Sequence, residues 1–305
     1  MFQVSVIIPV YNAVNFIERA VESIIHQDKV GEVILIDDGF PDGALEICKN
    51  LEKKYNKIKV FQHPNGENLG AGASRNLGMK IASCPYIAFL DADDFCLPER
   101  FKKTAIAFKQ NEAITAVYEP VGTAYLNEEA KRDFCRWRKI TKSEAETYLT
   151  YVNKEVEGRE FLISLLKGNN GSPCTVGITL KKSAIQDMLW FNSSLTLHQD
   201  SEFWVRLAYY GYFAPVENAT PIGMRYVHLE NRISKRSFHS ILKKEKVLFN
   251  WAKKEINDPL IYRLILKRYI YSLFQSKLNS ANIFALSICK IFYTFAIIVN
   301  PKSWK

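Results

Sequence analysis

Three carboxylates stand within four residues in Asp91-Ala92-Asp93-Asp94, directly after the apolar run Tyr86–Leu90. Like charges this close repel one another, and a hard divalent cation with its oxygen ligands would neutralise them. Mg²⁺ is commonly held by one or two carboxylates together with substrate phosphates, and Mn²⁺ prefers similar ligands. The cluster therefore predicts a metal-assisted site for a phosphorylated substrate; a solvated turn before a helix is the simpler alternative.

A glycine-rich segment offers a place for the phosphates. Gly70-Ala71-Gly72 opens a predicted helix, and Arg75 follows in its first turns. Backbone amides and the helix dipole favour an anion such as diphosphate at a helix N-terminus, and Arg75 adds a cation with bidentate geometry. The spacing differs from the dinucleotide fingerprint and no Walker lysine follows, which disfavours dehydrogenases and P-loop enzymes.

Alternating strands and helices position these clusters. Apolar runs and helical spacing predict strands at residues 3–10, 32–37, 58–62 and 86–90, with helices at 15–27 (capped by Asn15), 43–55, 73–82 and after Pro98. This order predicts an α/β fold with a doubly wound, mostly parallel sheet flanked by helices. Ligands of such sheets bind beyond the carboxyl ends of the strands, where Tyr11-Asn12, Asp37-Asp38 and Asp91–Asp94 fall.

The middle of the chain is less regular. Residues 114–118 and 176–180 are predicted strands, residues 131–142 a charged, exposed segment, and residues 200–210 a helix with Phe203 and Leu207 on one face. No repeat and no clear linker separates this region from the first, so a single domain over residues 1–231 is expected.

Four motifs follow one another in the first hundred residues. They are Val6–Asn12, Ile36–Gly39 with Asp42, Asn68–Asn76 and Phe89–Asp94. This ordered set resembles the family-2 inverting glycosyltransferases, whose fold is called GT-A, and the resemblance extends over roughly residues 3–230. It implies a GT-A fold and a nucleotide-sugar donor, most simply a UDP-sugar.

The resemblance also implies individual roles. The donor-binding residues carried over are Pro9, Tyr11, Asn12, Asp38, Arg75, Asp91 and Asp93. The turn after the first strand and Asp38 would hold the uracil, and Arg75 would help bind the nucleotide. The ribose would lie near Asp91, and Asp93 would ligate Mn²⁺ or Mg²⁺ at the diphosphate.

The family carries its catalytic carboxylate near the start of a later helix, and Gln199–Leu207 matches that stretch with Asp200 as the base. Gln199 stands where an acid is usual, and Phe40-Pro41 replaces small polar residues in the turn after Asp38. Arg225–His228 resembles an R-x-x-H stretch, which makes His228 a candidate ligand of the metal or diphosphate.

The implied chemistry is an inverting displacement. A sugar hydroxyl is a weak nucleophile, so Asp200 would accept its proton during attack on the anomeric carbon, a form of help typically worth about 10²–10⁴-fold. The metal and Arg75 would stabilise the charge that UDP gains as it leaves.

Charge divides the chain. The net charge is +9, yet residues 1–231 carry 26 basic and 29 acidic side chains, whereas residues 232–305 carry 15 and 3. Within the second part, Ala281–Val299 is apolar apart from a few polar residues that include Lys290. This pattern predicts a helical, basic, amphipathic extension that lies on an anionic membrane surface. An apolar helix docked on the catalytic domain, or a homodimer interface, is the alternative.

Location and acceptor follow from these features. The six cysteines are scattered and the N-terminus has no basic leader, so a cytoplasmic protein, peripheral on the inner face of the cell membrane, is expected. The acceptor is then a glycan or lipid-linked intermediate. Nucleic acid is disfavoured because the interleaved basic and aromatic residues run into an apolar segment.

Two other functions stay open. A sugar-1-phosphate nucleotidyltransferase has a related sheet, but Pro9–Asn12 lacks the glycine-rich basic loop usual after its first strand. A membrane-associated nucleotide-sugar-binding protein without turnover is the non-enzymatic alternative. The joint presence of Asp38, Asp91, Asp93 and Asp200 argues against it.

Overall fold

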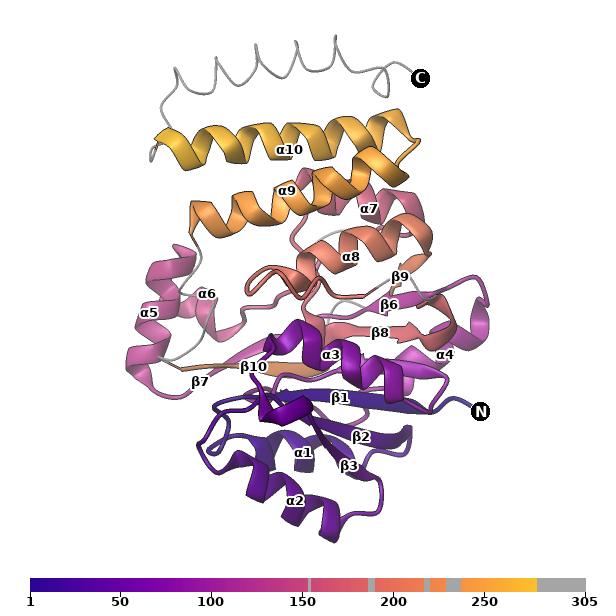
Figure 1. Cartoon of the computed structure of the whole chain (residues 1–305), viewed down its shortest axis with the longest axis vertical. Helices are drawn as coiled ribbons and strands as arrows, with labels where there is room; N and C mark the ends of the chain where they lie inside the picture. The colour runs from indigo at the N-terminus through magenta and orange to yellow at the C-terminus, as the bar shows by residue number, and fades with distance from the viewer. Residues whose placement is uncertain (153–154, 186–189, 217–219, 229–236, 279–305) are drawn as a thin grey trace.

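The computed structural model describes residues 1–152, 155–185, 190–216, 220–228 and 237–278, and a seven-stranded sheet forms its centre (Figure 1). Its strands are β1 (Val4–Val10), β2 (Val30–Asp37), β3 (Ile58–Gln62), β4 (Tyr86–Phe89), β6 (Ala116–Tyr118), β8 (Ile178–Lys181) and β9 (Phe213–Pro215). They lie in the order β3-β2-β1-β4-β8-β6-β9. Only β8 runs antiparallel to its neighbours in this sheet. The mixed, mostly parallel sheet confirms the predicted fold class.

Helices cover both faces of the sheet, which explains why its central strands are mostly apolar. Figure 1 shows α1 (Ile17–Ile25) and α2 (Ala44–Lys54) on one face and α3 (Gly70–Ile81) on the other. In β1, Val6 and Ile8 join the core under α1 and α2, whereas Ile7 joins the core on the opposite face. Each fully buried side chain of this kind contributes about 1.5–3 kcal/mol.

The remaining helices follow in chain order. They are α4 (Lys102–Gln110), α5 (Glu128–Arg138), α6 (Lys142–Glu146), α7 (Gly158–Lys167), α8 (Gln199–Tyr210), α9 (Phe238–Glu255) and α10 (Pro259–Leu278), with short 3-10 turns at Pro64–Gly66, Thr175–Gly177 and Lys182–Ala184.

The charged segment at residues 131–142 is mostly exposed, as predicted, and most of it belongs to the amphipathic helix α5, which buries Phe134 and Cys135 on one side. One local prediction was wrong. Asn15 does not cap α1: the cap position is Phe16, and no side chain caps it. The carboxylate of Asp42, distant in sequence, instead accepts hydrogen bonds from the nearby Ala13 and Val14 amides.

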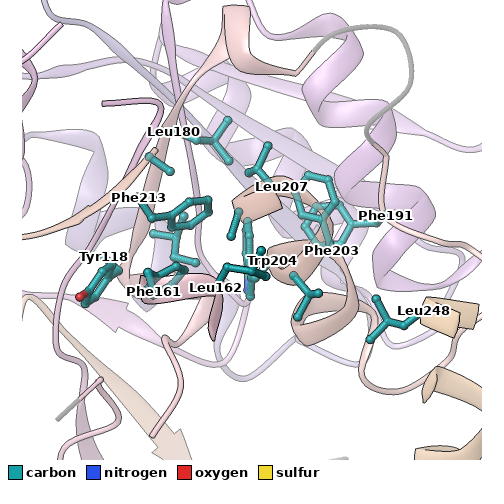
Figure 2. Close-up of a cluster of buried hydrophobic side chains, with 14 of the residues drawn as sticks. Tyr118, Phe161, Leu162, Leu180, Phe191, Phe203, Trp204, Leu207, Phe213 and Leu248 are labelled. Carbon is teal, nitrogen blue, oxygen red and sulfur yellow. The ribbon is translucent and has the colours of Figure 1, made fainter. Parts of the chain in front are cut away.

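A second hydrophobic core lies between the sheet and the C-terminal helices. Figure 2 shows Phe191, Phe203 and Trp204 grouped together, with Leu248 of α9 at the edge of the cluster. From α9 and α10, Leu248 and Ile265 are fully buried in the same cluster as Ile7 of β1. The described part of the basic C-terminal segment therefore packs on the sheet domain.

The predicted apolar helix Ala281–Val299 lies outside the described residues. Within the described part of the chain, no helix combines the length and apolarity needed to cross a bilayer.

A small second sheet, absent from the sequence-based predictions, lies at the edge where β1 and β4 end. It contains β5 (Phe95–Cys96), β7 (Gly122–Tyr125) and β10 (Gly223–Val227), with β10 in the middle. Antiparallel pairing places Gly223 opposite Cys96 and Met224 opposite Phe95. This register brings the end of β10 alongside the acidic cluster.

Candidate functional site

A cleft of about 850 Å³ opens at the carboxyl ends of β1 and β4. It is lined by the turn after β1, the start of α3, Asp91–Asp94, the start of α8 and the end of β10. Its size lies within the usual range for small-molecule sites. The predicted site residues that line it are Pro9, Tyr11, Asn12, Arg75, Asp91, Asp93, Asp200 and His228. The predicted position of the site at this edge of the sheet is thus matched by a cleft.

Asp91 and Arg75 form an ion pair at the start of the acidic cluster. Arg75 Nη2 donates to Asp91 Oδ1 at 2.6 Å, and its guanidinium lies 5.4 Å from the centre of the Phe191 ring. The Arg75 side chain is 7% exposed, whereas that of Asp91 is 39% exposed. Because Arg75 is held by α3 and Phe191, its guanidinium is a fixed positive charge in the cleft. Asp91 presents a carboxylate oxygen beside it.

Asp93 and His228 lie next to each other in the cleft. His228 Nε2 is 3.1 Å from Asp93 Oδ2, and the imidazole stacks on Phe16 with ring centres 4.8 Å apart. The main chain of Asp93 is also held, because Arg19 Nη2 donates to its carbonyl at 2.8 Å. The carboxylate remains 31% exposed, so it can meet a ligand in the cleft.

This pair fits the donor set of a divalent cation that is shared with a substrate. One carboxylate and one imidazole suit Mn²⁺ or Mg²⁺ when diphosphate oxygens and waters supply the other ligands. Among the described residues, no group of three or more histidine, cysteine, aspartate or glutamate side chains could hold a metal by itself.

Asp94 has a different environment from its two neighbours. It is 4% exposed, and its Oδ1 accepts the Tyr226 amide at 2.8 Å, which fixes β10 against the cluster. Burial, with the charges of Asp93 and Asp91, raises the pKa of Asp94 well above its ordinary value. Asp94 therefore holds the small sheet in place.

Arg225 is a functional candidate that the motif contained but the prediction did not assign. It lines the cleft beside the acidic cluster. Burial disfavours its charged form, but Cys174, Asp94 and Asp91 outweigh burial and raise the pKa of Arg225. Arg225 thus adds a positive charge to the cleft besides Arg75, and the R-x-x-H spacing was its only sequence signal.

Asp38 does not line the cleft. It is 2% exposed, and its Oδ1 accepts the amides of Leu69 and Gly70 at 2.9 and 3.0 Å, directly before and at the start of α3. The next residue, Gly39, has a positive φ, and a Cβ there would lie 2.2 Å from the Gly66 carbonyl oxygen. The structure therefore uses Asp38 to fix the loop that carries the glycine-rich helix start.

Asp42 similarly fixes the turn after β1, and sequence reasoning missed it as a site residue. Its Oδ2 accepts the amides of Ala13 and Val14 at 2.6 and 2.9 Å, and its Oδ1 accepts that of Ala44 at 3.0 Å. Within this turn, Tyr11 packs on Phe40 with ring centres 4.7 Å apart. The unusual phenylalanine thus supports a cleft-lining aromatic ring.

Asp200 stands in the first turn of α8 and lines the cleft. Its Oδ1 accepts the Ser201 amide at 2.7 Å, and the preceding cap residue, His198, has a left-handed backbone with φ of 64°. Gln199 packs over Gly72, where a Cβ would lie 2.2 Å from its Oε1. The positive end of the helix dipole favours a carboxylate at this position.

Solved structures with the same fold carry nucleotide ligands. TarS from S. aureus (residues 1–349, in complex with UDP-GlcNAc) aligns over 90% of this chain and 73% of its own length, with a TM-score of 0.65 and 18% identity. The mannosyltransferase PcManGT from Pyrobaculum calidifontis, in complex with GDP-Man and Mn²⁺, aligns over 98% and 81%, with a TM-score of 0.55 and 14% identity. At these identities the likeness establishes the fold.

Sequence relatives match about a third of the chain or somewhat more. An uncharacterized glycosyltransferase of Haemophilus influenzae is 38% identical over 112 residues, 36% of this chain and 44% of its own length. The minor teichoic acid biosynthesis protein GgaA of Bacillus subtilis is 37% identical over 123 residues, 38% of this chain and 24% of its own length. These matches span less than half of either relative. The model of the family named glycosyl transferase family 2 matches residues 5–163, more than half of the chain, and the protein therefore belongs to glycosyl transferase family 2.

Proposed function

We propose that this glycosyltransferase moves a sugar, with inversion, from a UDP-sugar to a hydroxyl of a glycan or lipid-linked acceptor. The observation that carries the proposal is a single cleft lined by Asp93, His228 and Asp200. Arg75 and Arg225 line the same cleft. Cations and a metal-ligand pair suit a diphosphate, and a carboxylate suits a hydroxyl nucleophile. The UDP-GlcNAc bound to TarS supports a uridine nucleotide as donor.

The diphosphate is proposed to bind at the acidic cluster. Asp93 and His228 would hold Mn²⁺ or Mg²⁺, which supplies positive charge to the leaving UDP. Arg75, held by its ion pair with Asp91, adds a cation that needs no reorganisation. Arg225 adds a second positive charge beside the acidic cluster. The Tyr11 turn would contact the uracil, Asp91 the ribose, and Asp38 would act through the loop that it fixes.

Asp200 is proposed as the general base. Its carboxylate lies at the cleft surface, where an acceptor hydroxyl can approach it. Deprotonation by Asp200 during in-line attack would convert an α-linked donor into a β-linked product. A base of this kind typically contributes about 10²–10⁴-fold to the rate.

The basic C-terminal segment is proposed to associate with an anionic membrane surface, on the cytoplasmic face. The exposed lysines of α9 and α10 are Lys243, Lys246, Lys253, Lys254 and Lys267. Each lysine near an anionic bilayer adds about 1 kcal/mol of attraction. A lipid-linked acceptor would be delivered by such a surface, and the teichoic acid role of GgaA is consistent with an envelope polymer.

Calorimetry with UDP, with and without Mn²⁺, tests the donor site. We expect Mn²⁺ to strengthen UDP binding by the wild type. Asp93→Ala should abolish this increase in UDP affinity, whereas the exposed control Asp133→Ala on α5 should retain the increase. Subsequent release of UDP from UDP-GlcNAc separates a transferase from a nucleotidyltransferase or a binding protein. Absence of UDP binding in both conditions would refute the uridine donor.

A further inference from the structure

We infer that helix α9 supports the catalytic centre. Its residues Ser240 and Lys244 are positioning residues for the segment that carries Asp200. The inference rests on the proposed role of Asp200 as the base. It gives the basic C-terminal segment a task in turnover that is separate from any contact with a membrane.

Two hydrogen bonds tie α9 to the chain just before α8. His198 Nε2 lies 3.2 Å from Ser240 Oγ, and Lys243 Nζ donates to the Ser194 carbonyl. The Ser240 hydroxyl donates to the Ser237 carbonyl at 2.8 Å. It must therefore accept from His198, whose Nε2 carries the proton.

The first of these bonds restrains a residue under backbone strain. His198 has φ of 64°, a left-handed conformation that is unfavourable for a residue with a side chain. It also lines the cleft two residues before Asp200. A conformation of this kind persists only when its surroundings hold it, and Ser240 supplies one such hold.

A buried ionic network anchors α9 at the next turn. Lys244 Nζ lies 2.9 Å from Glu245 Oε1, and Arg268 Nη2 of α10 lies 2.7 Å from the same oxygen. Arg268 Nη1 also donates to the Leu165 carbonyl at the end of α7, at 2.9 Å. The network locks α9, α10 and α7 together, so α9 is a rigid support for the segment before α8.

The charges of Lys244 and Asp200 also interact. Lys244 is 7% exposed; burial lowers its pKa, while the charges of Glu245 and Asp200 oppose that effect. Besides Asp200, the charged side chains and histidines of the cleft are Arg75, Asp91, Asp93, Asp94, Arg138, Arg225, His198 and His228.

The first experiment compares Ser240→Ala with Ser237→Ala in the full chain. Both variants damage the helix cap, since each serine bonds the other, but only Ser240→Ala removes the partner of His198. We expect hydrogen exchange of the amides of residues 194–202 to accelerate only in Ser240→Ala. Equal exchange in the two variants would overturn the positioning role of Ser240.

The second experiment measures UDP release from UDP-GlcNAc by Lys244→Met, Lys244→Arg and the exposed control Lys49→Met on α2. We expect Lys244→Met to lower kcat by about 10–100-fold with little change in donor KM, because a misplaced base costs rate and not donor binding. Lys244→Arg should restore most of the rate.

The outcomes separate this inference from the proposed function. If Lys244→Met and Lys49→Met have equal kcat, the role of Lys244 is refuted while the transferase assignment stands. If the wild-type protein releases UDP from no nucleotide sugar, the proposed function fails. The exchange comparison still decides whether α9 holds the segment before α8.

Discussion

The Asp93 carboxylate and the His228 imidazole lie 3.1 Å apart although 135 positions separate them in the chain. The short pairing of β5 with β10 creates this neighbourhood, since it runs the end of β10 beside the acidic cluster. Phe16, stacked on the imidazole, fixes the ring plane. The proposed metal site is thus built from two segments joined by a few strand hydrogen bonds.

Replacement of His228 tests that site. We expect His228→Ala to raise the Mn²⁺ concentration needed for half-maximal UDP binding by about tenfold or more, because one of two protein ligands is lost. Calorimetric UDP titrations at graded Mn²⁺ measure it. The exposed His26→Ala serves as the control. An unchanged Mn²⁺ requirement would remove His228 from the metal site.

Replacement of Asp200 tests the base. Asp200→Asn keeps the acceptor oxygen for the Ser201 amide but cannot take a proton, so we expect kcat to fall about 10²–10⁴-fold with UDP affinity retained. Release of UDP and calorimetry measure the two quantities. The exposed Glu160→Gln on α7 is the control. A rate near that of the wild type would assign the base elsewhere.

The buried pair of Arg100 and Glu119 predicts a large loss of stability. Both side chains are 1% exposed, and Arg100 also donates to the Val176 carbonyl at 2.9 Å. Glu119→Ala leaves the guanidinium buried without its counter-charge, which should cost about 3–5 kcal/mol in the free energy of unfolding. Urea denaturation measures it. The exposed Glu99→Ala should change stability by less than about 1 kcal/mol.

Glu32 predicts a specific loss of stability in acid. Burial alone would raise its pKa, but hydrogen bonds from Lys59, Ser5 and Ser83 lower the pKa of Glu32 to about 2, from an ordinary 4.5. Because the folded value is the lower one, the carboxylate stabilises the fold above about pH 4.5, and this contribution disappears as the pH falls toward 2.

The variant Glu32→Gln removes this titration. We expect it to be less stable than the wild type at pH 7, by up to about 3 kcal/mol, with the difference shrinking between pH 4.5 and 2. Urea denaturation across that range measures the difference. A gap between the two proteins that stays constant with pH would contradict the assignment.

The exposed lysines of α9 predict salt-sensitive binding to anionic vesicles. Lys253→Gln with Lys254→Gln should weaken sedimentation with phosphatidylglycerol vesicles by about 2 kcal/mol, since each lysine contributes about 1 kcal/mol. Lys49→Gln on α2 is the control, and phosphatidylcholine vesicles test for charge dependence. Equal binding to both kinds of vesicle would refute an electrostatic membrane contact.

The sequence was sufficient for the first half of the sheet. The predicted strand at residues 58–62 coincides with β3, and the other three strands of the first hundred residues lie within one or two residues of β1, β2 and β4. Burial on both faces produces continuous apolar runs, which are legible without any tertiary information. The helix start at Gly70 lay three residues before the predicted one, because Asp38 holds the preceding loop from a distance.

The acidic cluster shows what local sequence patterns could not predict. Sequence placed Asp91, Asp93 and Asp94 together as candidate ligands, but their surroundings give them different tasks. Arg75 pairs with Asp91, His228 with Asp93, and the Tyr226 amide with Asp94. His228 and Tyr226 lie 135 and 132 positions from their partners, whereas Arg75 lies 16 positions before Asp91.

The sequence by itself determined the α/β sheet, the edge at which its polar clusters gather and the family to which they belong. These follow from local periodicity and from the rule that parallel strands end at one edge. Only the tertiary structure decided that His228 meets Asp93, that Asp38 and Asp42 brace loops, and that α9 reaches the segment before Asp200. Those contacts depend on pairing and packing between distant segments, for which a single chain carries no periodic signal.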